Sequence, residues 1–233
     1  MLGLLNFKKQ KTMHTDDNAS IEEVRYVVID LELTGLNERR DSIVSMAGIK
    51  MVGGRIDFET VFYRLVKPRT ELTSESVIIH EITPSEVREK PDIEKVLSDF
   101  IEFCGSDVII GHCVSIDMGF LNRELKKLTG AVLENPVIDT SAVYAWIQKK
   151  FPQRSFPSSF RDSGLFDIAK HFGVPVSGAH NALMDAFITA QVFQRFIPML
   201  REGGIQSIGD LLILGNPSKG GDNVRLSQEM YSF

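Results

Sequence analysis

The apolar positions of the chain predict an α/β domain whose first strand begins close to Val24. Residues 26–31 are β-rich and almost continuously apolar, which is typical of a central strand covered on both faces of a sheet. Residues 42–52 and 55–66 are two further strand-like segments, and the Gly53-Gly54 pair between them is a strong hairpin signal. We therefore expect an antiparallel extension beside the first strand.

Helical and strand-like patterns alternate along the rest of the chain. Thr83 can cap a helix that has Pro84 at its first position and Glu86 at its third. The other expected elements are strands at 107–110 and 137–138 and helices at 91–104, 117–128, 140–149, 163–173 (capped by Ser163 and ended by Gly173) and 181–200. Alternation of strands and helices implies parallel pairing. The sequence thus predicts a mixed α/β sheet, with an antiparallel three-stranded part, parallel strands beside it and helices around both.

The chain divides into three expected segments. Residues 1–22 lack apolar periodicity and are interpreted as a mobile leader. Residues 23–200 form the domain, since the length of the chain, 233 residues, suits one globular unit. Residues 201–233 contain one short apolar stretch, at 205–214, and are expected to form a C-terminal extension with a short helix and a polar tail.

Composition excludes several classes of protein. No apolar run approaches the roughly 18 residues that span a bilayer, so no membrane partner is expected. The lysine cluster Lys8, Lys9 and Lys11 follows the first apolar residues instead of preceding them, which argues against a secretory signal and favours a cytoplasmic location. The formal net charge of −5 gives no general attraction to phosphate, so any affinity for nucleic acid must be local. Metal cations held by carboxylates can supply that local charge.

Two carboxylates on the predicted central strand are the first candidates for chemistry. Asp30 and Glu32 stand two residues apart, so both side chains leave the same face of the sheet. Burying two like charges in an apolar strand is costly unless a cation lies between them, and a hard divalent metal ion would serve. The alternative is an edge strand whose acids face water. The following Thr34-Gly35 turn would let another segment approach closely.

Three further residues are candidates by their position. Asp117 opens a predicted helix shortly after a strand that ends at Gly111-His112; such an acid can simply favour the helix dipole, but strand ends are also where α/β sheets bind ligands. His180 and Asp185 would point about 140° apart on one continuous helix. They can converge only if His180 lies on the loop before the helix. Otherwise they are ordinary surface residues.

Taken together, these residues resemble the motifs of a known enzyme family. The segments Asp30-Leu31-Glu32-Leu33-Thr34-Gly35, Gly111-His112 with Asp117, and His180-Asn181-Ala182-Leu183-Met184-Asp185 are similar to the three motifs of the DEDDh exonucleases, which include the proofreading epsilon subunit of bacterial DNA polymerase III. The resemblance covers roughly residues 26–196. Leu33 replaces a common threonine, and Cys113-Val114-Ser115 stands where Asn-Ala is common, but neither departure touches a metal-ligand position.

The resemblance implies a ribonuclease-H-like fold and a 3′→5′ exonuclease that hydrolyses DNA with two Mg²⁺ ions, for which Mn²⁺ can substitute. Asp30, Glu32 and Asp185 would hold one ion, and Asp30 would bridge to a second ion supported by Asp117. His180 would take the proton from the attacking water.

The resemblance also suggests contacts with the substrate. The backbone of Leu33, Thr34 and Gly35 would meet the 3′-terminal hydroxyl, and Leu36 would pack against the last base. His112 would contact a phosphate, although a histidine in that position is often only a structural hydrogen bonder. In the loop at 151–162, Arg154 and Arg161 are candidates for guiding the strand.

Two other functions stay open at this point. The Asp30-Leu31-Glu32 and Thr34-Gly35-Leu36 segments also resemble oligoribonucleases, whereas His80-Glu81-Ile82-Thr83 fits the epsilon-like branch better. A module that binds nucleic acid without cleaving it is the alternative of another class, which the presence of all five motif residues disfavours. The expected partners are single-stranded or frayed 3′ ends of DNA, with RNA as a second substrate.

The end of the chain suggests a protein partner. Gln228, Met230 and Phe233 form a glutamine-led, apolar-ended segment that resembles the peptides by which replication proteins bind a sliding clamp. A polymerase or a sliding clamp is thus a candidate partner. The alternative is a polar terminus in which apolar residues occur by chance.

Overall fold

A computed structural model describes residues 16–154, 156, 164–176 and 180–217. The predictions for Arg161, for the cap at Ser163 and for the tail residues Gln228, Met230 and Phe233 fall outside these residues.

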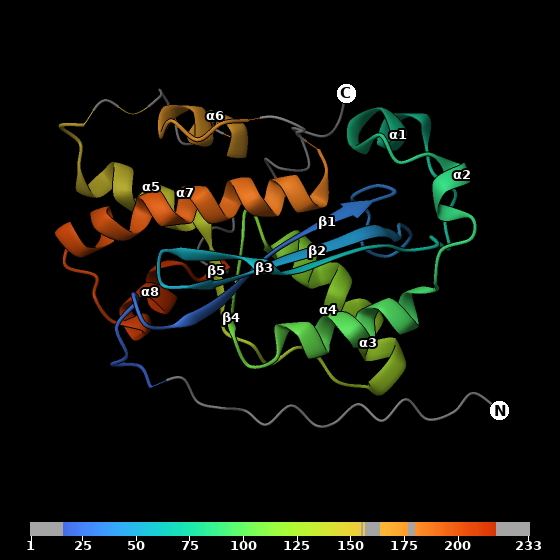
Figure 1. Cartoon of the computed structure of the whole chain (residues 1–233), viewed down its shortest axis with the longest axis horizontal. Helices are drawn as coiled ribbons and strands as arrows, with labels where there is room; N and C mark the ends of the chain where they lie inside the picture. Colours follow the sequence, from blue (N-terminus) through green and yellow to red (C-terminus); the bar gives the residue numbers. More distant parts are fainter. Residues whose placement is uncertain (1–15, 155, 157–163, 177–179, 218–233) are drawn as a thin grey trace.

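One five-stranded sheet, in the order β3-β2-β1-β4-β5, forms the centre of the domain (Figure 1). Its strands are β1 (Arg25–Leu33), β2 (Ile43–Val52), β3 (Arg55–Leu65), β4 (Val108–Gly111) and β5 (Val137–Asp139). The pairs β1–β2 and β2–β3 are antiparallel, and the pairs β1–β4 and β4–β5 are parallel. This confirms the predicted mixed sheet and the central place of the first strand.

Helices cover both faces of the sheet (Figure 1). On one face α3 (Ile93–Cys104) and α4 (Ser115–Thr129) pack against Val27, Ile29 and Leu31. The other face carries α5 (Thr140–Lys150), α6 (Leu165–His171), α7 (Ala182–Glu202) and α8 (Ile208–Leu214), which share a core with Tyr26 and Val28. Because strand residues alternate between faces, Asp30 and Glu32 belong to the α7 face.

Two short helices follow β3. The helix α2 (Pro84–Val87) begins where predicted, and the Thr83 backbone N–H donates to Glu86 Oε2 at 2.8 Å. The preceding helix α1 (Ser74–His80) was not predicted. It is capped by the Thr73 hydroxyl, which accepts from the Ser76 N–H at 3.0 Å. Only two of its seven residues, Ser76 and His80, are buried, so it has no apolar stripe that a pattern could reveal.

The start and end of the described chain pack together. Ile21, within the expected leader, is 1% exposed and joins the main core. The Ile208 N–H donates to the Ala19 carbonyl at 2.9 Å, and the Gly209 N–H donates to the Asp17 carbonyl at 2.9 Å. Residues 16–22 therefore belong to the domain and pack beside α8. Sequence periodicity misses them because their partner lies almost the whole chain away.

Two other boundaries differ from expectation. The helix α7 continues two residues beyond 200, and α8 contributes the fully buried Ile208 and Leu211 to the main core. Gly164, one residue after Ser163, is the N-cap of α6.

In the described part of the chain, no helix is both long enough and apolar enough to cross a membrane.

Candidate active site

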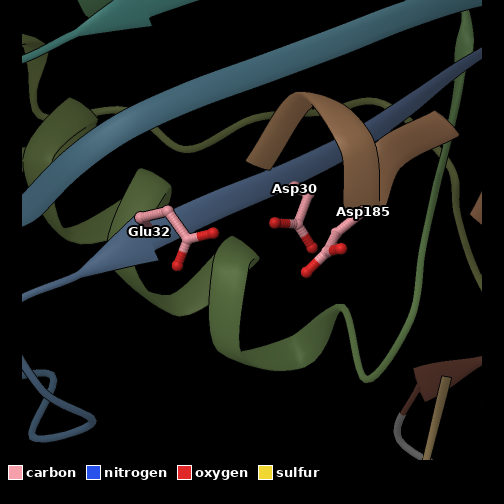
Figure 2. A group of neighbouring side chains, drawn as sticks. All are labelled: Asp30, Glu32 and Asp185. Carbon is pink, nitrogen blue, oxygen red and sulfur yellow. The ribbon is translucent and has the colours of Figure 1, made fainter. Parts of the chain in front are cut away.

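Three carboxylates meet between β1 and α7. Asp30 and Glu32 from β1 and Asp185 from α7 each present an oxygen atom within 4.8 Å of the others (Figure 2). Figure 2 shows the carboxylates of Asp30 and Asp185 facing one another, with Glu32 one step along the strand. We call these three residues the carboxylate cluster. Such a set of hard oxygen donors suits a divalent cation such as Mg²⁺ or Mn²⁺.

The first turn of α7 is built to bring Asp185 to the sheet. Asn181 caps the helix, because its Oδ1 accepts hydrogen bonds from the backbone N–H groups of Leu183 at 3.1 Å and Met184 at 3.4 Å. Ala182 and Ala186 are fully buried against β2. These small side chains let α7 lie close to the strands, so the short Asp185 side chain reaches the acids of β1.

Asp117 lies beside the cluster without belonging to the 4.8 Å group. It is buried in the first turn of α4, and its carboxylate accepts a hydrogen bond from the backbone of Leu31. Its charge acts on both Asp30 and Glu32. The four acids therefore form one interacting set drawn from a strand and two helices on opposite faces of the sheet.

Burial and mutual repulsion raise the pKa values of these four carboxyl groups. Burial, and then the charges of Asp117, Glu32 and Asp185, raise the pKa of Asp30 well above its usual value. Burial is likewise the main cause that raises the pKa of Glu32 and of Asp117 to about 8 and that of Asp185 to about 7. The sequence-based expectation that a cation must relieve this repulsion has a physical basis here.

A pH dependence of stability follows for the metal-free protein. Between about pH 4 and 8 the acids Glu32, Asp117 and Asp185 bind more protons in the folded protein than in the unfolded chain, where carboxyls titrate near pH 4. Proton binding by these acids therefore stabilises the folded state fully at low pH. This contribution is lost as the pH rises through 7–8. We expect the Tm measured in a chelator to fall between pH 5 and 8.5, with 1 kcal/mol corresponding to roughly 2–4 °C. Mg²⁺ should restore it at pH 8.5, and a Tm that is flat over this range would contradict the expectation.

His180 stands at the rim of the carboxylate cluster. It precedes the cap residue of α7 and has a left-handed backbone with φ of 64°, so it lies on the loop as its spacing from Asp185 required. Its backbone N–H donates to Asp185 Oδ2 at 3.2 Å. The imidazole ring lies edge-on to the Phe166 ring, with centroids 5.1 Å apart. The contact between the loop and α7 is thus made by the His180 backbone and not by its ring nitrogens.

His112 has a structural contact. Its Nδ1 pairs with the Thr140 hydroxyl at 3.0 Å, and that hydroxyl donates to the Gly111 carbonyl at 3.1 Å. Burial lowers the pKa of His112, which favours the neutral ring. These contacts favour the structural alternative for His112 over the phosphate contact.

The turn after β1 is held tightly. The Thr34 hydroxyl accepts from the Ser42 N–H at 2.9 Å, and the Thr34 N–H donates to the Ser42 carbonyl at 2.9 Å. A Cβ atom at Gly35 would lie 2.6 Å from a carboxylate oxygen of Asp41. The close approach predicted at this glycine therefore comes from its own loop. Leu33 and Leu36 stay partly exposed.

Arg154 lies far from the carboxylate cluster. It pairs with Glu202 at 2.6 Å, at the opposite end of α7 from Asp185. Their separation of 17 positions (202 − 185) corresponds to about 25 Å of helix. This position argues against a role for Arg154 in guiding the strand to the acids.

Asp139 is a site residue that the sequence reasoning missed. Its Oδ1 accepts hydrogen bonds from the Cys113 N–H at 3.0 Å and from the Ser141 N–H at 2.8 Å. Cys113 has a φ of 52°, so this carboxylate fixes a strained turn between β4 and α4. Its charge also raises the pKa of Asp117. Its position could have been noticed in the sequence, because Asp139 ends the β5 strand, and functional groups of α/β sheets commonly lie at the carboxyl ends of strands.

Comparisons with known proteins agree with this arrangement. Residues 27–193, which include the four motif acids and His180, match the sequence profile of the exonuclease family RNase_T. The chain is 32% identical over 195 residues to the PolC-type DNA polymerase III of Thermotoga maritima and 33% identical over 187 residues to that of Bacillus subtilis. The matches cover 84% and 80% of this chain but 13% and 12% of the polymerases. The chain thus spans about an eighth of the length of these relatives.

Solved structures share the fold. Exonuclease X in complex with 5′ overhanging duplex DNA has a TM-score of 0.57 at 23% identity, covering 80% of this chain and 99% of that one. The nuclease domain of 3′hExo, a DEDDh family member bound to rAMP, has a TM-score of 0.63 at 17% identity, covering 81% and 97%. The expected ribonuclease-H-like fold is confirmed. The chain therefore belongs to the RNase_T family of exonucleases and has the fold of its DEDDh members.

Proposed function

We propose that this exonuclease domain removes nucleotides one at a time from the 3′ end of a DNA strand, using divalent cations held by the carboxylate cluster. The observation that carries the proposal is the meeting of Asp30, Glu32 and Asp185, with Asp117 beside them and His180 at the rim. These five residues occupy the positions that the family resemblance assigns to catalysis. The 3′→5′ direction and the DNA substrate are inferred from that resemblance.

The residues present fit a bound cation. Asp185 Oδ1 is buried and has no hydrogen-bond partner among the described residues, so an acceptor is left open in the cluster. A buried acceptor without a partner is costly, and a cation would satisfy it. Asp30, Glu32 and Asp185 would hold the first Mg²⁺ or Mn²⁺ ion, and Asp30 with Asp117 would hold the second. When bound, two such ions neutralise phosphate charge and promote the formation of a nucleophile from water.

The protein's own groups would carry the rest of the reaction. His180 would accept the proton of the attacking water, because an imidazole can take and return protons near neutral pH. The rigid turn at Leu33, Thr34 and Gly35 would seat the 3′-terminal nucleotide, and Leu36 would pack against its base. The hydrogen bonds between Thr34 and Ser42 support this role, because they keep the turn in a fixed conformation, and a binding site must be preorganised.

The relatives support DNA and a replication setting. The curated relatives are PolC-type DNA polymerases, and Exonuclease X was solved with duplex DNA. The 3′hExo domain was solved with rAMP, which keeps RNA as the second candidate substrate. Service to a polymerase is part of the proposal. Docking to a sliding clamp through Gln228, Met230 and Phe233 stays a prediction about residues outside the described structure.

A preference for unpaired ends is expected. A site that acts on a single strand requires the last nucleotide of a duplex to unpair before it enters, which costs a few kcal/mol. Single-stranded DNA and duplexes with two mismatched 3′ nucleotides should therefore be digested at least about tenfold faster than blunt duplexes.

End-labelled substrates of one sequence would test both the function and this preference. Release of mononucleotides from the 3′-labelled end, dependent on Mg²⁺ or Mn²⁺, is the expected result. Equal rates on blunt and frayed duplexes would contradict the preference. Faster digestion of RNA strands of two to five nucleotides than of single-stranded DNA would instead assign the domain to the oligoribonuclease type.

A further inference from the structure

An apolar strip lies exposed between β3 and the first turns of α7. It consists of Phe58, Val61 and Tyr63 from β3 and of Leu183 and Phe187 from α7, and we call it the aromatic strip. Phe58 is 69% exposed and Val61 is 40% exposed. The Phe58 and Phe187 rings pack edge-to-face with centroids 5.6 Å apart. Contiguous exposed apolar groups of this kind mark an interaction surface more often than single ones do.

A bulge in β3 displays Phe58. Ile49 of β2 pairs with Val61, but the next residue, Lys50, pairs with Asp57. Phe58, Glu59 and Thr60 thus form an extra loop without partners on β2, and this loop leaves the Phe58 ring in solvent. Bulges commonly re-aim a side chain near a functional site.

The aromatic strip is continuous with the carboxylate cluster. Asp30 pairs with Ala47, and Ala47 pairs with Tyr63, so Asp30 and Tyr63 lie on one face of the sheet two strand spacings apart, or roughly 10 Å. The Tyr63 hydroxyl lies 3.5 Å from Asn181 Nδ2, next to His180. Burial and the charge of Glu32 raise the pKa of Tyr63, which is consistent with this proximity. The distance corresponds to about three stacked nucleotides.

We propose that the aromatic strip stacks the unpaired bases of the nucleic-acid strand whose 3′ end lies at the carboxylate cluster. This inference rests on the proposed function and adds the means by which single strands are held. Stacking on aromatic rings tolerates every base, as an exonuclease that degrades any sequence requires.

Bases fit the strip better than phosphates do. The exposed acids Glu59, in the bulge, and Asp57, next to it, repel the phosphate backbone and leave the rings to the bases. Bases of a duplex have their faces covered by their neighbours, so the strip favours unpaired strands. Pairing of β3 with the same strand of a second copy is disfavoured, because a bulge interrupts the regular edge.

The first test is the Michaelis constant for a single-stranded DNA of twelve nucleotides, measured with the full chain. Phe58→Ala should raise KM about 5- to 100-fold, the loss expected for one base–ring stack, with kcat unchanged. Phe58→Trp should keep the wild-type KM, and Phe58→Leu should behave like Phe58→Ala. Ile213→Ala is the matched control, because Ile213 is 63% exposed on α8.

An abasic scan tests the contact itself. Removing one base at positions two to five from the 3′ end should raise KM for the wild-type protein at one or more positions. At that position Phe58→Ala should cause no further rise. A Phe58→Ala variant with an unchanged KM, or one equally impaired on intact and abasic strands, overturns the proposal.

Two other results are distinguishable from these. If the wild-type protein releases no nucleotides from any strand, the proposed function fails, whereas digestion that is identical in wild type and Phe58→Ala refutes only the stacking role. Gel filtration supplies a separate check. If Phe58→Ala converts an oligomer to a monomer in parallel with its loss of activity, the strip is a subunit interface and the base-stacking proposal is overturned.

Discussion

Asp185→Asn should inactivate the exonuclease and at the same time stabilise the metal-free protein. Asparagine has almost the same shape but loses the negative charge of a cluster ligand. Activity should fall by more than the roughly 10- to 100-fold loss that follows changes outside the ligand shell. In a chelator at pH 8 the Tm should rise, because one of the mutually repelling charges beside Asp30 and Glu32 is gone.

Asp107→Asn is the matched control for this result. Asp107 is also a buried carboxylate, but it pairs with Lys50 at 2.6 Å and with Arg25 at 3.0 Å. Its loss should lower stability by about 3 kcal/mol and leave turnover per folded molecule unchanged. Thermal melts and single-turnover digestion would measure both effects. Wild-type turnover by Asp185→Asn, or a lowered Tm in the chelator, would refute the role of the cluster.

His180→Asn should lower kcat by about 10²–10⁴-fold, the usual contribution of a general base. Asparagine tolerates the left-handed backbone at this position and keeps the backbone N–H that donates to Asp185 Oδ2. The Tm and the binding of single-stranded DNA should therefore change little. The loss should lie in the chemical step.

Rescue would separate a chemical role from a structural one. Added imidazole should restore part of the activity of His180→Asn, and the rate of the variant should rise with hydroxide concentration. His171→Asn, which changes an exposed histidine on α6, should behave like the wild type. If His180→Asn kept wild-type kcat, or if it lost activity only by losing DNA binding, His180 would not be the base.

The parts of the fold that sequence could predict are those with local patterns. The apolar run of β1 indicated a doubly covered strand, and the two-residue spacing placed Asp30 and Glu32 on one face. The loop position of His180 followed from its spacing to Asp185. The RNase_T family match agrees with the motif resemblance.

Other features depend on partners far along the chain. The packing of Ile21 depends on α8, and the hydrogen bonds of Asp139 depend on the turn at Cys113. The bulge at residues 58–60 is set by how β3 pairs with β2, whereas the sequence alone reads as one continuous strand. The helix α1 has seven residues and only two buried side chains, so its sequence shows no apolar periodicity that could predict it. Such features become visible only when the chain is folded.

The origin of the carboxylate cluster in distant parts of the chain has a consequence for biosynthesis. Asp30 and Asp185 are 155 residues apart (185 − 30), and α7 is the element that brings the second to the first. A ribosome releases the N-terminal strands long before that helix has been made. A nascent chain that ends before α7 therefore lacks Asp185 and cannot complete the carboxylate cluster. Under the proposed function, nuclease activity would arise only once α7 has been made, and a chain truncated before residue 182 should be inactive.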